Sequence, residues 1–389
     1  MKILSIETSC DETALAALNI SGDLANPKIE ILGTELYSQI EKHRPYGGVF
    51  PSLAKREHTT NLIPLLSSLL KNLQQNQKEI IEINNTTKRE LEELFIHEPG
   101  LANDFIEFIS KTSKPEFDML AVTEGPGLEP ALWVGINFAI ALSKIWQIPL
   151  MPVNHMVGHI VSVLNHTTKA GGNKINFPAI SLLISGGHTQ LISIKNWGNY
   201  KVIGSTKDDA VGEAFDKVAR LLGLQYPGGP EISKLAEQAR KENFPNSKFK
   251  LPSPMINTDD FDFSFSGLKT AVLYLTQKIQ INGKLSEKNK KQIALEFENS
   301  VTNVLIKKTM KALDKTGSKT LIIGGGVIAN QHIRESFERL LKNDFSLYLP
   351  EKELSTDNAI MIGISAFLKS FSVIAKIEPE IIADGNLSF

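Results

Sequence analysis

Two segments of the chain share one design, and this repetition constrains the fold more than any other feature. "KILSIETSCDETALAALNI", from Lys2, and "AISLLISGGHTQLISIKN", from Ala179, each contain an apolar strand, a short polar turn and a second apolar strand. Each pattern predicts a β-hairpin at the start of a lobe. The 389 residues also exceed what one hydrophobic core usually supports. Because strand and helix patterns alternate along the chain, we expect an α/β protein with two similar lobes.

The bends of both hairpins are rich in small residues. Residues Thr8 to Cys10 form the first bend and Ser185 to Gly187 the second. Small side chains let backbone N–H groups approach a phosphate closely. An ordinary hairpin turn is the simpler explanation of either cluster alone. Their repetition one lobe apart favours a duplicated nucleotide-binding fold.

A third glycine cluster follows another apolar strand. "KTLIIGGGVIANQHIRESFERLL" predicts a strand over 321–323, a turn at 324–326 and a helix that begins near Ala329. This order places a helix N-terminus where α/β proteins bind ligands, although the glycine spacing is not that of a dinucleotide fingerprint. Asp216 lies in a helical segment before the turn at Pro227 to Gly229. It is either a solvated helix residue or a ligand for ribose hydroxyls.

Two histidines occupy the segment "NHMVGHI". His155 and His159 are four residues apart and lie on one face of any helix formed here, which suits a metal ion. In hydrolytic zinc motifs a glutamate follows the first histidine, and here that position is Met156. The pair therefore lacks the usual water-activating base. A purely structural role remains the alternative.

A carboxylate near the end of the chain could complete a metal site. In "STDNAIMIG", Asp357 precedes an apolar helix, where either Thr356 or Asp357 could be the N-cap. If Asp357 instead binds metal, the His, His, Asp set suits iron or zinc and leaves positions open for substrate. The sequence leaves the capping and metal-binding alternatives open.

Composition limits the compartment and the partners. The single cysteine, Cys10, excludes an internal disulfide framework and fits a reducing compartment. The N-terminus becomes polar too early for a signal peptide, and no apolar run is long enough to span a bilayer. We therefore expect a cytoplasmic protein without membrane insertion. The net charge of −1 does not by itself indicate a nucleic-acid partner.

Seven segments together resemble one family. They are "SIETSCDETA", "NHMVGHI", "LISGGHTQL", "GEAFDKVARLLGLQYPGGP", "FSFSGLKTAV", "GGGVIANQHIR" and "STDNAIMIG". In this order they are similar to the tRNA N6-adenosine threonylcarbamoyltransferases, the bacterial TsaD (formerly Gcp) family. The resemblance extends from Lys2 to about Gly363 and implies the two-lobed α/β fold of actin, sugar kinases and heat-shock ATPases, with a central cleft.

The resemblance also implies an activity and its partners. Family members transfer a threonylcarbamoyl group from threonylcarbamoyl-AMP to the N6 amine of adenosine 37, next to the anticodon, in tRNAs that read codons beginning with adenine. AMP is the leaving group. The implied cofactor is one divalent metal ion per subunit, iron(II) in the first place and zinc as the alternative. The implied partners are the tRNA anticodon loop, an inactive paralogue (TsaB) and a small ATPase (TsaE).

Carried over residue by residue, the resemblance assigns the site. It implies that His155, His159 and Asp357 bind the metal, and that Asp11 and Glu12 orient or deprotonate the amine. The residues implied to contact the donor are Leu183, Ile184, Ser185, Gly186, Gly187, Asp216, Gly229 and Asn330.

The expected domains are residues 1–155 and 156–389, with the segment from about 355 returning to the cleft and the first lobe. Residues 71–117, rich in Asn, Gln, Glu and Lys, exceed the family's short connection and predict a polar, partly helical surface insertion.

Three other functions are compatible with parts of the sequence. A metal-dependent endopeptidase, an old label of the family, would need the base that Met156 replaces. A sugar kinase or chaperone-like ATPase of the same fold would explain the hairpins but not the histidine pair. A non-catalytic scaffold paralogue would lack His155, His159 and Asp357. The presence of all three favours the catalytic transferase.

Overall fold

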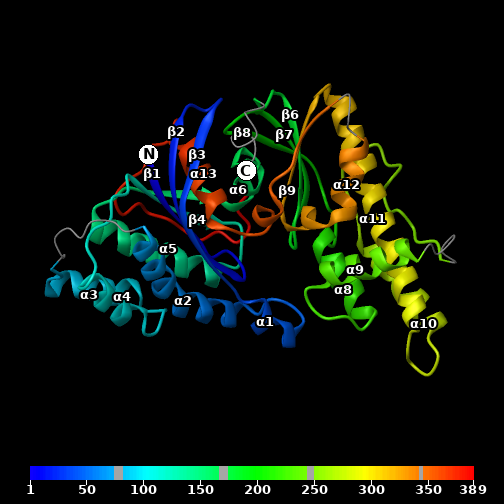
Figure 1. The fold of residues 1–389 in the computed structure, drawn as a ribbon, viewed down its shortest axis with the longest axis horizontal. Helices are drawn as coiled ribbons and strands as arrows, with labels where there is room; N and C mark the ends of the chain where they lie inside the picture. Colours follow the sequence, from blue (N-terminus) through cyan, green and yellow to red (C-terminus); the bar gives the residue numbers. More distant parts are fainter. Residues whose placement is uncertain (74–81, 166–173, 243–248, 341–344) are drawn as a thin grey trace. The chain divides into compact units, whose positions relative to one another are not determined.

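The first of two units is built on a five-stranded sheet of order β3-β2-β1-β4-β5 (Figure 1). The computed structural model describes residues 1–73, 82–165, 174–242, 249–340 and 345–389. Strand β1 pairs antiparallel with β2 and parallel with β4, and β4 pairs parallel with β5. The strands are β1 (Lys2–Glu7), β2 (Glu12–Gly22), β3 (Pro27–Ser38), β4 (Met119–Gly125) and β5 (Leu150–Asn154).

The second unit repeats this topology strand for strand. Its sheet has the order β10-β9-β6-β7-β8, in which β6 and β7 form the hairpin and β9 lies parallel to β6. Its strands are β6 (Ala179–Ile184), β7 (Thr189–Asn196), β8 (Asn199–Ser205), β9 (Thr320–Gly324) and β10 (Ser346–Tyr348). The duplicated α/β design predicted from the two hairpins is therefore confirmed.

Helices cover both faces of the first sheet, which explains why its central strand β1 is buried on both sides after Lys2. Leu4 and Ile6 of β1 belong to the core formed with α2 and α5. Ser5 points to the other face, where its hydroxyl donates to Ala359 O at 2.6 Å. The helices of this unit are α1 (Ile40–His43), α2 (Pro51–Asn72), α3 (Asn85–Leu94), α4 (Leu101–Ile109), α5 (Glu129–Trp146), α6 (His155–Val161) and α13 (Ala359–Lys369).

The second unit has its own core, centred on α8, α9 and α11. Its α-helices are α8 (Val211–Leu221), α9 (Gly228–Lys241), α10 (Ser266–Ile279), α11 (Glu287–Thr316) and α12 (Gln331–Leu340), with 3-10 turns η1 (Arg44–Tyr46), η2 (Gly326–Ala329) and η3 (Lys352–Leu354). The helix expected to begin near Ala329 therefore begins at Gln331, after the 3-10 turn η2. In the described part of the chain, the longest apolar helical stretch falls short of a membrane span.

The two units do not divide the chain at residue 155. The first comprises residues 1–43, 49–174 and 357–389, and the second comprises residues 44–48 and 175–356. Helix α6 follows β5 directly and packs against α13, so residues just after 155 stay with the first sheet. The chain from Asp357 onward also belongs to the first unit.

The insertion expected at 71–117 is only partly a polar surface element. Residues 74–81 lie outside the described residues, while α3 and α4 follow from Asn85. One face of these helices is apolar and packs into the core of the first unit; it comprises Leu91, Phe95, Leu101, Phe105 and Ile109. Buried Glu98, between the helices, pairs with Lys55 of α2 at 3.1 Å. The polar average composition conceals this amphipathic pattern.

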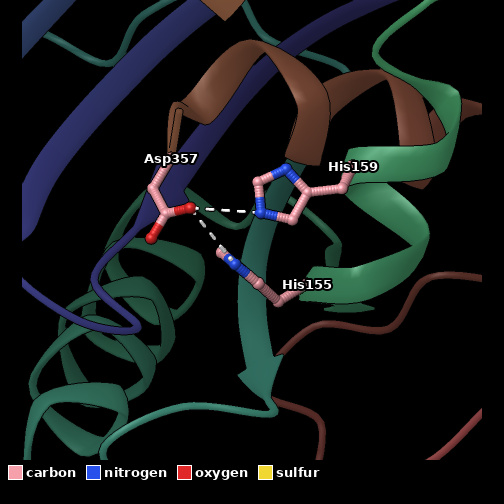
Figure 2. Close-up of side chains that lie close together, drawn as sticks. All are labelled: His155, His159 and Asp357. Carbon is pink, nitrogen blue, oxygen red and sulfur yellow. Dashed lines mark ion pairs between the residues drawn. The ribbon is translucent and has the colours of Figure 1, made fainter. Parts of the chain in front are cut away.

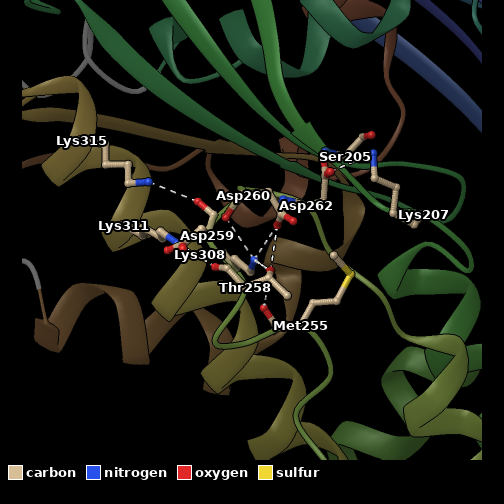
Figure 3. A network of polar contacts seen from close by, with 10 residues as sticks. All are labelled: Ser205, Lys207, Met255, Thr258, Asp259, Asp260, Asp262, Lys308, Lys311 and Lys315. Carbon is tan, nitrogen blue, oxygen red and sulfur yellow. Dashed lines mark hydrogen bonds and ion pairs between the residues drawn. The ribbon is translucent and has the colours of Figure 1, made fainter.

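A polar network fastens the loop before α10 to helix α11 in the second unit (Figure 3). The buried ammonium group of Lys308 donates to Thr258 Oγ1 at 2.6 Å and to Asp260 Oδ1 at 2.9 Å. Asp262 accepts from the backbone N–H of Ser205 at 2.9 Å, which ties the same loop to β8. The network thereby fixes the start of the "FSFSGLKTAV" segment.

Replacing Lys308 with methionine is expected to lower the Tm of the protein by roughly 5 °C at pH 7, because the hydrogen bonds from its buried ammonium group to Thr258 and Asp260 are lost. The hydrogen bond from Lys308 lowers the pKa of Asp260 from 3.8 to about 2. A depressed carboxyl pKa stabilises the fold above pH 4, and this contribution disappears as pH falls through about 2. The Tm values of Lys308→Met and the wild-type protein, measured from pH 7 to pH 2, should therefore converge as the pH falls. A constant difference across this range would contradict the assignment.

Candidate active site

Helix α6 holds both predicted histidines, with His155 as its first residue and His159 in its last turn. Its N-cap is Asn154, whose side-chain oxygen accepts from the N–H groups of Met156 and Val157 at 2.9 and 3.2 Å. Because the two histidines are four residues apart within this helix, both imidazoles lie on one face, with ring centroids 4.7 Å apart. Gly158 allows α13 to pack closely, since a Cβ there would lie 3.1 Å from Met361 Cγ.

Asp357 extends toward these two rings from the start of α13 (Figure 2). Its Oδ1 lies 3.4 Å from His155 Nε2 and 3.2 Å from His159 Nε2. The N-cap of α13 is Asn358, whose side chain accepts from Met361 N at 3.0 Å. Capping by Thr356 or Asp357, the alternative from the sequence, is therefore wrong. The neighbouring Asn358 caps the helix and leaves Asp357 facing the histidines.

The geometry of these three side chains fits a metal ion. One ligand atom from each of His155, His159 and Asp357 lies within 4.8 Å of the others. Tetrahedral ligands bound to zinc at about 2.0–2.2 Å lie roughly 3.3–3.6 Å from one another, close to the distances found here. Buried His159 makes no hydrogen bond to the described residues through either ring nitrogen. Its Nε2 lies close to Asp357 Oδ1 but without hydrogen-bond geometry.

The charges around the histidines also favour a cation. Burial alone would raise the pKa of Asp357, but the attraction of His155 and contacts with both rings lower it below its usual range. Burial lowers the pKa of His155, yet the charges of Asp357 and Glu7 outweigh it and the net shift is upward. Two ionised carboxylates thus converge on one buried pair of rings. A divalent cation neutralises such an excess of negative charge.

Asp11 and Glu12 lie where the first hairpin bends back into β2. Burial raises the pKa of both carboxyl groups, and the adjacent Asp11 raises that of Glu12 further, well above its ordinary value. Burial and the charge of Asp11 also raise the pKa of the Cys10 thiol well above normal. The raised pKa makes Glu12 a stronger base than an ordinary carboxylate, whereas the raised pKa of Cys10 disfavours it as a nucleophile.

Two buried histidines that sequence reasoning missed hold this bend in place. His58 lies 3.0 Å from Cys10 O through Nε2 and 2.8 Å from Thr13 Oγ1 through Nδ1. Gln39 connects it to His43, whose Nε2 is 3.0 Å from Gln39 Oε1. Burial lowers the pKa of both rings, that of His58 to about 4, so they stay neutral at pH 7. The available signal was "FPSLAKREH", which ends in His58.

The expected donor-binding turn lies at the end of β6 in the second unit. Leu183 and Ile184 are buried strand residues, and the turn closes through a hydrogen bond from Ser185 N to His188 O at 2.9 Å. A Cβ added at Gly186 or Gly187 would meet no atom within 4 Å. These two glycines are therefore not required by packing, and they leave the backbone of the turn accessible.

The remaining predicted donor residues gather around the start of α9. Asp216 accepts from Gly228 N at 2.6 Å, beside Gly229. Asn330 caps α12 by accepting from Ile333 N at 3.0 Å. Its amide nitrogen donates to buried Glu298 at 2.7 Å and lies 3.4 Å from Ser233 of α9. Both polar side chains already have partners that fix their orientation.

Comparisons with known proteins agree with these observations. A sequence model described as "TsaD: tRNA N6-adenosine threonylcarbamoyltransferase" matches residues 30–88 and 104–364. The protein named tRNA N6-adenosine threonylcarbamoyltransferase from Polynucleobacter necessarius is 41% identical and covers 95% of this chain and 92% of its own length. Its namesake from Nitrosomonas eutropha is 39% identical over the same shares of the two chains.

A solved structure supports the fold assignment. Full-length HypF in its phosphate- and nucleotide-bound form has a TM-score of 0.53 at 13% identity, and the match covers 96% of this chain and 47% of HypF. Together with the repeated sheet topology, it confirms the predicted actin-like α/β fold class with duplicated halves. On the strength of its sequence matches, the chain belongs to the tRNA N6-adenosine threonylcarbamoyltransferase (TsaD) family.

Proposed function

We propose that this protein transfers the threonylcarbamoyl group of threonylcarbamoyl-AMP to the N6 amine of adenosine 37 in tRNAs that read codons beginning with adenine. The observation that carries this proposal is the cluster of His155, His159 and Asp357, which fits a metal ion and belongs to a chain of the TsaD family. As the substrate is tRNA, the proposed reaction takes place in the cytoplasm.

The reaction needs positioning more than a reactive protein nucleophile. The adenine nitrogen forms a bond to the carbamoyl carbon, the bond from that carbon to the phosphate oxygen breaks, and AMP leaves with the electron pair. The amine is a weak nucleophile because its lone pair is delocalised into the ring. We assign the removal of its proton to the Glu12 carboxylate, whose raised pKa makes it a stronger base than an ordinary carboxylate, and we assign Asp11 to orienting the amine.

The proposed metal ligands are His155, His159 and Asp357, with iron(II) as the expected ion and zinc as the alternative. The chemistry that a bound divalent ion supplies is Lewis-acid stabilisation of the negative charge on the departing phosphate. The carboxylate of Glu7 contacts the ligand His155, and the neutral rings of His58 and His43 hold the Asp11 bend in place. This preorganisation lowers the barrier because no side chain has to reorient during the reaction.

Donor recognition is assigned to residues of the second unit. Backbone groups of Ser185, Gly186 and Gly187, together with the adjoining Leu183 and Ile184, would contact the donor. Asp216 and Gly229 are proposed at the ribose. Asn330 is proposed at the adenine side, and the hydrogen bond from its amide nitrogen to Glu298 sets the orientation of its side chain. As partners we propose the tRNA anticodon loop, an inactive paralogue (TsaB) and a small ATPase (TsaE).

The test combines the purified protein with synthetic threonylcarbamoyl-AMP, the partner subunits and an unmodified tRNA that reads an adenine-starting codon. Nucleoside analysis should detect N6-threonylcarbamoyladenosine. A matched tRNA with guanosine at position 37 should remain unmodified. Release of AMP without modified tRNA, or cleavage of a protein substrate, would instead support hydrolysis or the endopeptidase alternative.

A further inference from the structure

Buried Glu7, at the end of β1, contacts the outer nitrogen of one candidate metal ligand. Its Oε2 lies 3.1 Å from His155 Nδ1, on the opposite side of the ring from the Nε2 that faces Asp357. The same carboxylate accepts from Ser9 N at 2.5 Å and from Thr123 Oγ1 at 2.6 Å. It is therefore fixed by a backbone N–H of the first hairpin and by a side chain of β4.

We propose that Glu7 is a positioning residue for the metal site, which holds the proton of His155 on Nδ1 and leaves Nε2 as the metal-binding atom. This inference rests on the proposed metal-binding role of His155. A carboxylate accepts hydrogen bonds but cannot donate them, so its contact with Nδ1 selects one tautomer of the neutral ring. Carboxylate partners of this kind orient metal-bound histidines and make them stronger ligands.

Other buried histidines of the same unit show that a carboxylate is not needed merely to satisfy a buried ring. The described contacts of His58 are to Cys10 O, Thr13 and Gln39, all uncharged. His43 is likewise bonded to the amide of Gln39 and to Phe50 N. A buried charge is costly unless something compensates for it. The carboxylate at His155 is therefore not a general requirement of buried rings in this unit, and it marks a ring whose other nitrogen faces Asp357.

The two proposed histidine ligands differ in the contacts of their Nδ1 atoms. His159 Nδ1 makes no hydrogen bond with the described residues, whereas His155 Nδ1 contacts Glu7 and lies 3.2 Å from Ser9 Oγ. Glu7 therefore acts on one ligand, and its loss should weaken metal binding without abolishing it. Removing His159 itself should have the larger effect.

The test measures zinc affinity by competition with a chromophoric chelator. Glu7→Gln keeps the size of the side chain but places an amide beside His155, and we expect zinc to bind about 10–100-fold more weakly. The matched control is Glu98→Gln, which neutralises another buried carboxylate of the unit, one that pairs with Lys55 instead. It should change zinc affinity less than threefold. Equal affinity of Glu7→Gln and wild-type protein, with the fold intact by circular dichroism, would overturn the inference.

A second readout follows the proton itself. In zinc-loaded, 15N-labelled wild-type protein, long-range 15N–1H correlation spectra should show His155 with a slowly exchanging proton on Nδ1 and metal on Nε2. Zinc on Nδ1 would contradict the role of Glu7 even if Glu7→Gln fails to fold. Failure of the wild-type protein to bind zinc or iron(II), or unchanged binding by His159→Ala, would instead reject the underlying metal site.

Discussion

Replacing His159 with alanine is expected to reduce tRNA modification about a thousandfold or more while the protein remains folded. His159 is buried beside Asp357, and its loss would leave one histidine and one carboxylate to hold the ion. Several kcal/mol of transition-state stabilisation by a metal ion correspond to a factor of this size. The measurement is the initial rate of N6-threonylcarbamoyladenosine formation with saturating donor and partner subunits, together with bound metal per chain.

A suitable control is His97→Ala, because His97 is exposed on the connection between α3 and α4. This variant should retain normal rate and metal content. The double variant of His155 and His159 should be no more active than His159→Ala alone, since either substitution destroys the same site. Normal product from the double variant would refute the assignment of these residues to the active site.

Replacing Glu12 with glutamine is expected to lower kcat by about a hundredfold to ten-thousandfold, the usual contribution of a general base. Burial raises the pKa of Glu12 well above its ordinary value, and Asp11 raises it further. The base is active when deprotonated, so the wild-type rate should rise with pH as this pair loses its proton. The apparent pKa belongs to the coupled pair. In Glu12→Gln this acidic limb should disappear.

The measurement is kcat against pH with metal content monitored at every point. Glu30→Gln is the matched control, because Glu30 is an exposed carboxylate on β3 of the same sheet. Its pH profile should coincide with that of the wild-type protein. If Glu12→Gln kept the wild-type rate and pH profile, Glu12 would not be the general base, and another group would have to accept the proton.

Local sequence patterns were enough to predict the repeated hairpins and the histidine pair. The spacing of His155 and His159 places them on one helix face whatever the remainder of the chain does. Asp357 lies about two hundred residues further along. The local sequence left capping and metal binding open there, and the resemblance favoured metal binding, since only tertiary packing of α13 brings Asp357 to α6. The N-cap was misjudged because Thr356, Asp357 and Asn358 all suit that position. The observed capping bond belongs to Asn358.

The residues around the site were harder to predict. Glu7 ends a strand that reads as ordinary core, and its contact with His155 depends on β1 and α6 meeting across the fold. His43 and His58 belong to separate helices and meet through Gln39. The apolar face of α3 and α4 was hidden because Asn, Gln, Glu and Lys dominate the composition of that segment. Such features depend on contacts distant in sequence, which local periodicity does not encode.

The most direct measurement is the position of the metal in crystals of the iron(II)- or zinc-loaded protein, recorded on both sides of the absorption edge of the metal. We predict one anomalous peak about 2.0–2.2 Å from His155 Nε2, His159 Nε2 and an oxygen of Asp357. A peak elsewhere in a fully loaded, active protein, with these three side chains bound to nothing, would contradict the account.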